Sequence, residues 1–175
     1  MHNRHSAMQS SLDSILITKG ISKIAHSGRT LSDHLEGTAM LLISWQSEAQ
    51  IVTAGRYHSI YGTKAFNRSL LTSTDRSMVS QHIGSYAESL IWSFSLLSRP
   101  SVFKCGARYL GCMDYRLEKP NWNIDERFLR DLLEIELANL CEIGHSSKAS
   151  DLVRYVTQFR PTLVRSTIIR ALLEK

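Results

Sequence analysis

The chain has 175 residues, of which 43% are hydrophobic and 21% are charged, and its formal net charge is +5. No apolar run approaches the roughly 20 residues that cross a bilayer. The first residues lack the apolar block that is typical of a signal peptide. The chain has three cysteines, Cys105, Cys112 and Cys141, and they form no C-x-x-C pair. Lysine and arginine are dispersed rather than gathered on one face, so we expect neither a nucleic-acid nor a membrane partner and place the protein in the cytoplasm.

The scarcity of prolines and the long helix-compatible stretches predict an all-α fold: one bundle of seven or eight helices without a sheet. We expect one domain over residues 1–175, with a core over about 26–142 and C-terminal helices in 143–175. The first helix is predicted over about 7–19 and ends at Gly20. "IAHSGR" is predicted to be a loop. Thr30 then opens a helix with Asp33 as its capping-box partner, and its buried side is marked by Leu31, Leu35, Thr38, Leu42 and Trp45.

Residues 48–58 predict the next helix, with Gly55 and His58 on its apolar stripe, and Gly55 would allow a neighbouring helix to come close. Two further helices are expected to meet near Gly84. Residues 101–124 are predicted to be a long connection, with a short helix or a lid over the site as possibilities. Asp125 is expected to cap a helix that runs to about Cys141, "GHSSKAS" to be a loop, and two short helices to be split around Pro161.

Three polar residues, His34, His58 and Asn139, occupy positions that helical periodicity assigns to the interior. Each costs about 1–3 kcal/mol if it is buried without a partner. One such residue is usually a satisfied core histidine. Three on separate helices, with Ser59 adjoining, are harder to explain in this way, and they could converge at one polar centre, which the sequence alone does not show.

The pattern resembles the HD-domain superfamily of helical metal-dependent phosphohydrolases, in particular the hydrolase domain of alarmone hydrolases. In "DHLEGTAMLLISWQSEAQIVTAGRYHS" the chain has His34 and then His58-Ser59, and in "IELANL" it has Asn139 after Ala138. It is also similar to a bacterial group whose domains carry R-T-x-x-D-H and H-S-I/V-Y-G-T. Residues 26–88 and 128–142 carry the resemblance, which implies a helical HD-like domain.

Two departures from the superfamily pattern concern its metal site. Ser59 stands where the superfamily has the aspartate of a His-Asp doublet, and Asn139 stands where it has a last aspartate. Both replacements are neutral and poor ligands for a divalent cation. We therefore expect no cofactor, or at most a weakly bound Mn, Fe or Mg ion held by His34, His58 and Asn139.

The candidate catalytic residues are His34 and His58 as acid and base, Ser59 as a hydrogen-bond donor or nucleophile, and Glu88 as a base that faces the cavity. Glu88 is otherwise a salt-bridge residue, and Glu142 has a weaker claim of the same kind. Candidate substrate-binding residues are Arg29 beside a helix N-terminus, Arg76, Tyr61, Thr63 and Asn139; Arg29 is equally well explained as a surface residue.

Three functions remain open on this pattern. The first is a small-molecule enzyme that uses the histidine pair for acid–base chemistry on a small anionic or phosphorylated substrate, without a tightly bound metal, in specialised metabolite biosynthesis. The second is a metal-dependent phosphohydrolase or oxygenase of the HD superfamily. The third is a non-catalytic module that binds a nucleotide-like ligand. The sequence leaves the oligomeric state open.

Overall fold

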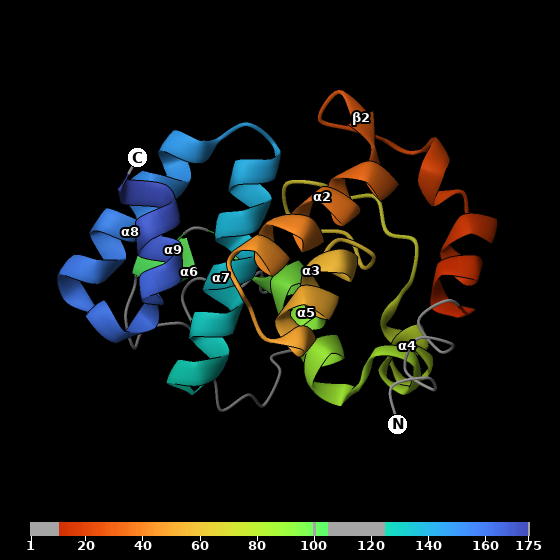
Figure 1. Cartoon of the computed structure of the whole chain (residues 1–175). Coiled ribbons are helices and arrows are strands. Elements are labelled where there is room, and N and C mark those ends of the chain that lie inside the picture. Colours follow the sequence, from red (N-terminus) through yellow and green to blue (C-terminus); the bar gives the residue numbers. More distant parts are fainter. Residues whose placement is uncertain (1–10, 100, 105–124, 175) are drawn as a thin grey trace.

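A computed structural model describes residues 11–99, 101–104 and 125–174 of the chain (Figure 1). The fold is an all-α bundle of about eight helices with one minor two-stranded ribbon, so the predicted fold class is confirmed. A helical segment over residues 11–18 comes first. The later α-helices are α2 (Leu31–Ser44), α3 (Ala49–Tyr57), α4 (Arg76–Ile83), α5 (Ser85–Leu96), α6 (Ser101–Lys104), α7 (Glu126–Glu142), α8 (Ser146–Phe159) and α9 (Ser166–Leu173). Short 3₁₀ turns lie at η1 (Ile21–Lys23), η2 (Ser73–Asp75) and η4 (Pro161–Leu163).

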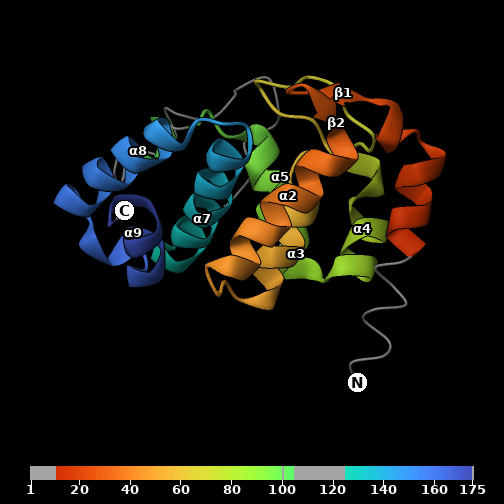
Figure 2. The same ribbon diagram turned by 45° about the horizontal axis from the view of Figure 1, so that its top comes forward.

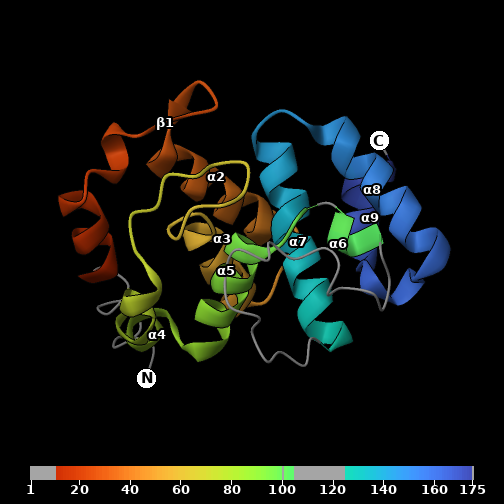
Figure 3. The same ribbon diagram turned by 180° about the vertical axis from the view of Figure 1, so that it is seen from behind.

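Four helices form the centre of the bundle. Helix α2 packs on α3 and α7, and both α3 and α7 contact α5. The helical segment 11–18 and α4 lie on one side of this centre, while α8 and α9 cover α7 on the other, with α6 beside them (Figures 1 and 3). The four central helices bring residues from three distant parts of the sequence to one place.

Helix α2 forms as its sequence predicts. The Thr30 hydroxyl accepts the Asp33 N–H and the Asp33 carboxylate accepts the Thr30 N–H, which completes the capping box. All five residues of the predicted stripe are buried, and His34 is buried with them. The tight packing of α3 on α2 depends on Gly55, because a Cβ at that position would lie less than 3.0 Å from Cδ1 of Leu42.

The segment 25–30 differs from its prediction. We expected a loop and no sheet, but β1 (Ala25–His26) and β2 (Arg29–Thr30) pair as an antiparallel ribbon (Figure 2). Ser27 and Gly28 both have positive φ, 48° and 83°, which is the geometry of the two-residue turns that favour hairpins. The register pairs His26 with Arg29, so their side chains leave the ribbon on the same face.

The second correction concerns residues 144–150, which we expected to be a loop. Helix α8 already begins at Ser146, and only three residues, Ile143, Gly144 and His145, separate it from α7. Gly144 adopts a φ of 80°, and the His145 N–H donates to the Leu140 carbonyl 2.8 Å away, which closes α7 within one turn. The left-handed glycine makes a longer connection unnecessary.

The remaining predicted boundaries can be compared directly. Gly84, with φ 86°, separates α4 from α5, and Asp125 caps α7 by accepting the Phe128 N–H. Gly20 is left-handed and follows the first helix, as predicted. Residues 7–10 of that predicted helix, and 105–124 of the predicted connection, lie outside the described residues. No helix in the described ranges is both long and apolar enough to cross a membrane.

Candidate functional site

Two imidazoles meet in the middle of the bundle. His34 lies one turn into α2 and His58 is the residue that ends α3. Their Nε2 atoms are 3.1 Å apart, and the ring planes cross at 78°. Both residues are buried, with 0% and 1% of their surface exposed. The close packing of α2 on α3 at Gly55, one turn before His58, brings the two rings within hydrogen-bonding distance.

The hydrogen bonds of the pair determine how many protons it holds. His58 Nδ1 lies 2.7 Å from the Gly55 carbonyl oxygen, which only accepts, so this nitrogen carries a proton. His34 Nδ1 contacts Oε2 of Glu142. One more proton must lie between the two Nε2 atoms, since otherwise their lone pairs would face each other. A third proton must lie between Nδ1 of His34 and Oε2 of Glu142, on one atom or the other. With these three protons, Glu142, His34 and His58 together carry no net charge.

Burial explains where that proton resides. Removal from water lowers the pKa of His34 to about 4, with the Arg29 charge acting in the same direction and a hydrogen bond to the Asn139 side chain opposing it. Burial, followed by the charge that His34 can carry, holds the pKa of His58 well below its usual value. Burial also raises the pKa of Glu142. The favoured arrangement is two neutral rings with a proton on the Glu142 side.

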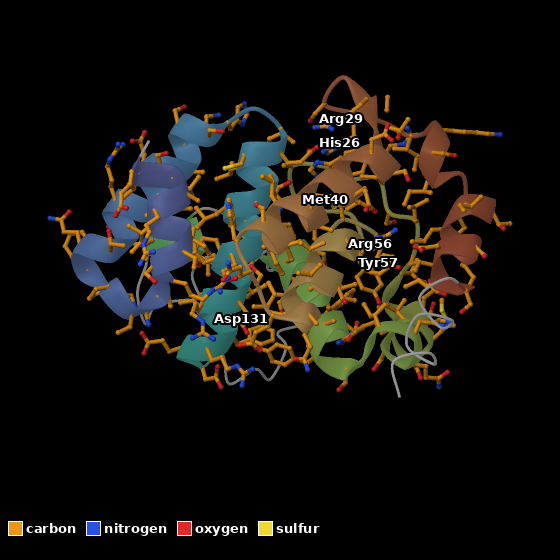
Figure 4. All side chains as sticks on the ribbon, viewed as in Figure 1. His26, Arg29, Met40, Arg56, Tyr57 and Asp131 are labelled. Atoms are coloured by element: carbon orange, nitrogen blue, oxygen red, sulfur yellow. The ribbon has the colours of Figure 1, made fainter. Side chains whose placement is uncertain are left out.

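Glu142 is supported from two directions. Nη2 of Arg29 contacts Oε1 of Glu142 and donates to the Glu142 backbone carbonyl at 3.0 Å. Gly37 on α2 leaves room for the Glu142 side chain, because a Cβ at position 37 would lie 2.6 Å from Oε1 of Glu142. The Arg29 side chain remains 44% exposed, so the residue predicted to bind substrate lies at the surface and is paired with a carboxylate. Figure 4 shows it beside His26 on the hairpin, above the start of α2.

Three aromatic side chains surround the histidines. The His26 ring lies over that of His34, with centroids 4.2 Å apart, and Phe66 meets His26 edge to face. Phe94 of α5 meets His58 in the same way, at 5.0 Å. His26 was not among the predicted site residues, because its expected loop position is as compatible with solvent exposure as with a function. The turn residues Ser27 and Gly28 were the sequence signal for the hairpin, and the hairpin is what positions His26 next to His34.

Asn139 links the pair to a second buried charge. Its side-chain nitrogen lies 3.3 Å from Oε2 of Glu136, and the same oxygen accepts from Nη1 of Arg99 at 2.6 Å. A polar chain therefore runs from the histidines through Asn139 to Arg99. Burial raises the pKa of Glu136, and burial lowers the pKa of Arg99. Neither Glu136 nor Arg99 was anticipated from the sequence.

Glu88 belongs to a different cluster. Its carboxylate accepts two hydrogen bonds from Arg76, at 2.6 and 2.8 Å, and one from the Tyr61 hydroxyl at 3.2 Å. The Arg76 guanidinium also lies over the ring of Trp92. Tyr61 and Thr63 line a cavity of about 650 Å³. The structure thus groups these predicted residues with one another, and the described contacts of Glu88 do not include either histidine.

Ser59 is buried beside His58, but both ring nitrogens of His58 are engaged elsewhere, with Gly55 and His34. In this arrangement neither ring nitrogen of His58 is available to accept the Ser59 hydroxyl proton, as the predicted activation of Ser59 requires. Ser59 is placed next to the pair without a hydrogen bond to it among the described residues.

The donor set can be tested against the metal that the HD resemblance implies. The pair presents two imidazole Nε2 atoms to each other, Glu142 lies behind His34 at Nδ1, and the Asn139 side-chain nitrogen is directed to Glu136. Within the described ranges, no group of three or more histidine, cysteine, aspartate or glutamate side chains is arranged to hold an ion. A neutral donor set of this kind does not fit a hard divalent cation, which requires carboxylate oxygens.

Comparison with known proteins gives one match. Residues 15–99, slightly less than half of the chain, match a family model described as a domain of unknown function, DUF6817. No curated protein and no solved structure is significantly similar to the chain. The matched span includes His34, His58 and Arg99 but ends before α7, which carries Asn139 and Glu142.

Proposed function

We propose that the protein is a small-molecule enzyme on an HD-like helical scaffold, in which His34 and His58 perform acid–base chemistry on an anionic substrate without a tightly held metal ion. The observation that supports this most strongly is the 3.1 Å approach of two Nε2 atoms whose Nδ1 atoms already have partners. Such a pair shares a proton that can move along existing hydrogen bonds.

The two rings have different roles in this proposal. His34 receives a proton from Glu142 at Nδ1 and can release one from Nε2, which makes it the acid. His58 donates its Nδ1 proton to the Gly55 carbonyl, so its Nε2 presents a lone pair and makes it the base. A substrate atom that enters between the two Nε2 atoms would receive a proton from His34 and lose one to His58. The number of protons in the site is the same before and after this exchange.

The proposal can be tested with a panel of phosphate monoesters, nucleotides and carboxylates, incubated with protein in buffer without added metal and followed by ¹H and ³¹P NMR. We expect turnover of at least one anionic compound. His34→Gln and His58→Gln should reduce its rate by about 10²–10⁴-fold, the usual contribution of a general acid or base. His82→Gln is the matched control, because the His82 ring bonds to Ser11 on the far side of the bundle from α7.

Three results would contradict the proposal. Undiminished turnover in both histidine variants would remove the pair from the chemistry. Turnover that appears only with added Mn²⁺ would favour the metal-dependent phosphohydrolase or oxygenase. A panel member that binds and is recovered unchanged would identify a ligand-binding module.

A further inference from the structure

Arg99 is a buried cation whose donors are only partly used. It lies between α5 and α6, its side chain is 8% exposed, and its guanidinium carbon is 3.5 Å from the centre of the Phe94 ring. Nη1 donates to Glu136, whereas Nε is buried without a hydrogen-bond partner, and no described residue accepts from Nη2. The Nε–H and one Nη2–H lie along one edge of a guanidinium, the edge that binds a carboxylate through two parallel hydrogen bonds. Among the residues that the structure describes, none accepts a hydrogen bond at that edge.

Arg99 lines a cavity of about 500 Å³ between the α5–α6 connection, α7 and α8. This volume is in the range of small-molecule sites. The apolar part of the cavity wall is formed by Leu140, Ile143 and Leu152. The polar groups of the wall include those of Asn139 and Lys148. A ligand here would have one polar end at Arg99 and an apolar remainder.

The charges around the cavity favour a monoanion. Glu136 offsets Arg99, and Asp151 on the cavity wall offsets Lys148. A dianion would bring a second negative charge toward Glu136 without a further buried cation among the described lining residues to balance it. A carboxylate, by contrast, requires only the two Arg99 donors, at Nε and Nη2, that no described residue uses.

The cavity adjoins the histidine pair through two residues. Asn139 lines it and also contacts Glu136 and His34. The Phe94 ring lies between Arg99, at 3.5 Å, and the His58 ring, at 5.0 Å. A molecule anchored at Arg99 would therefore lie one side chain away from the proposed acid and base.

We propose that this cavity binds a small monocarboxylate, with its carboxylate on the Nε–Nη2 edge of Arg99 and its hydrocarbon part against Leu140, Ile143 and Leu152. Arg99 is then the residue that selects the substrate. This inference rests on the proposed function, for which it names the substrate class, but the binding itself can be measured without turnover.

The test is calorimetric titration of the full chain with acetate, hexanoate and benzoate, and with inorganic phosphate and hexanol as controls for charge and for the apolar chain. Hexanoate and benzoate should bind more tightly than acetate, and phosphate and hexanol should bind weakly. Arg99→Lys keeps the charge but loses the two-donor edge, so it should weaken hexanoate binding by about tenfold or more. Arg127→Gln removes an exposed cation of α7 and should leave binding unchanged.

If Arg99→Lys does not fold, Arg99→Met combined with Glu136→Leu removes both buried charges together and should abolish hexanoate binding in a folded protein. Equal hexanoate affinity in wild type and the Arg99 variants, or phosphate binding as tight as hexanoate, would overturn the inference. Arg99-dependent binding together with undiminished turnover in His58→Gln would refute the proposed function alone. Loss of turnover in His58→Gln without Arg99-dependent binding would refute this inference alone.

Discussion

The contact between α2 and α3 at Gly55 sets the separation of the two histidines, and it can be tested by Gly55→Ala. The new methyl group would lie less than 3.0 Å from Cδ1 of Leu42 and 3.6 Å from Cγ2 of Thr38. Leu42 and Thr38 are both fully buried, so neither can move aside into solvent. The two helices must separate or Leu42 must leave its preferred rotamer.

Two opposing contributions determine the size of the effect. Overpacking of a well-packed core costs about 1–3 kcal/mol, and alanine stabilises a helix interior by about 1 kcal/mol relative to glycine. Since the overlap with Leu42 is severe, we expect the upper end of the first range and a net destabilisation of about 2 kcal/mol. The shift would also lengthen the distance between the two Nε2 atoms, because His58 is anchored to the Gly55 carbonyl.

Urea unfolding monitored by circular dichroism measures the change. With a slope near 2 kcal/mol per molar urea, the midpoint should fall by about 1 M. The matched background is Leu42→Ala, in which the clashing methyl groups are absent. Adding Gly55→Ala there should be neutral or stabilising by up to about 1 kcal/mol. If Gly55→Ala costs the same free energy in both backgrounds, the contact with Leu42 is not the reason for the glycine.

Three further predictions concern stability. The pKa of His34 is about 4 in the folded protein against 6.5 in the unfolded chain, so unfolding takes up a proton at His34 between these values, and this group alone should lower stability by about 3 kcal/mol as the pH drops from 6.5 to 4. The lowered pKa of His58 acts in the same direction, and the raised pKa of Glu142 acts in the opposite direction. In His34→Gln the fall in stability over this range should be smaller by about 3 kcal/mol, and an unchanged curve would contradict the assignment. Arg165→Met leaves the Glu134 carboxylate buried without its cation and should cost about 3–5 kcal/mol in urea unfolding, much of which Glu134→Leu should restore. Thr30→Ala removes the cap of α2 and should cost about 1 kcal/mol, whereas Thr30→Ser should cost less, and equal losses would exclude the hydroxyl as the cause.

The sequence predicted those features that depend on neighbouring residues. The cap at Thr30, the buried stripe of α2 and the break at Gly84 each follow from residues within a few positions of one another. The meeting of His34 with His58 was also foreseeable, because both lie on the buried sides of consecutive helices. The hairpin was missed because "AHSGRT" is too short to show strand periodicity, so only its turn residues could have indicated it.

The partners of the histidines were harder to predict because they are distant along the chain. Arg29 and Glu142 are 113 positions apart, and their pairing depends on where α7 crosses α2. Glu142 was only a weak candidate, since its distance of three residues from Asn139 gives a shared face but no partner. Arg99 was not foreseen at all, because its buried partner, Glu136 of α7, is 37 positions away along the chain.

Buried carboxylates of the described core are paired with arginine, and Glu142 differs from the others because it also contacts a histidine. Arginine does not give up its proton at any physiological pH, so a glutamate held by it is a fixed charge pair that stabilises the packing of two elements. Such pairs are Glu88 with Arg76, Glu134 with Arg165 and Glu136 with Arg99, and the buried Asp131 is paired with Arg130 on its own helix. Glu142 also contacts an arginine, Arg29, but its other oxygen contacts His34, a group that can release a proton and pass it to His58. A carboxylate needed only for packing would have no use for a buried imidazole as a second partner, because that imidazole must itself be desolvated. A proton that moves between these groups would give the second partner a use, and this is the physical reason for placing the proposed chemistry at this pair rather than at the arginine–carboxylate pairs around it.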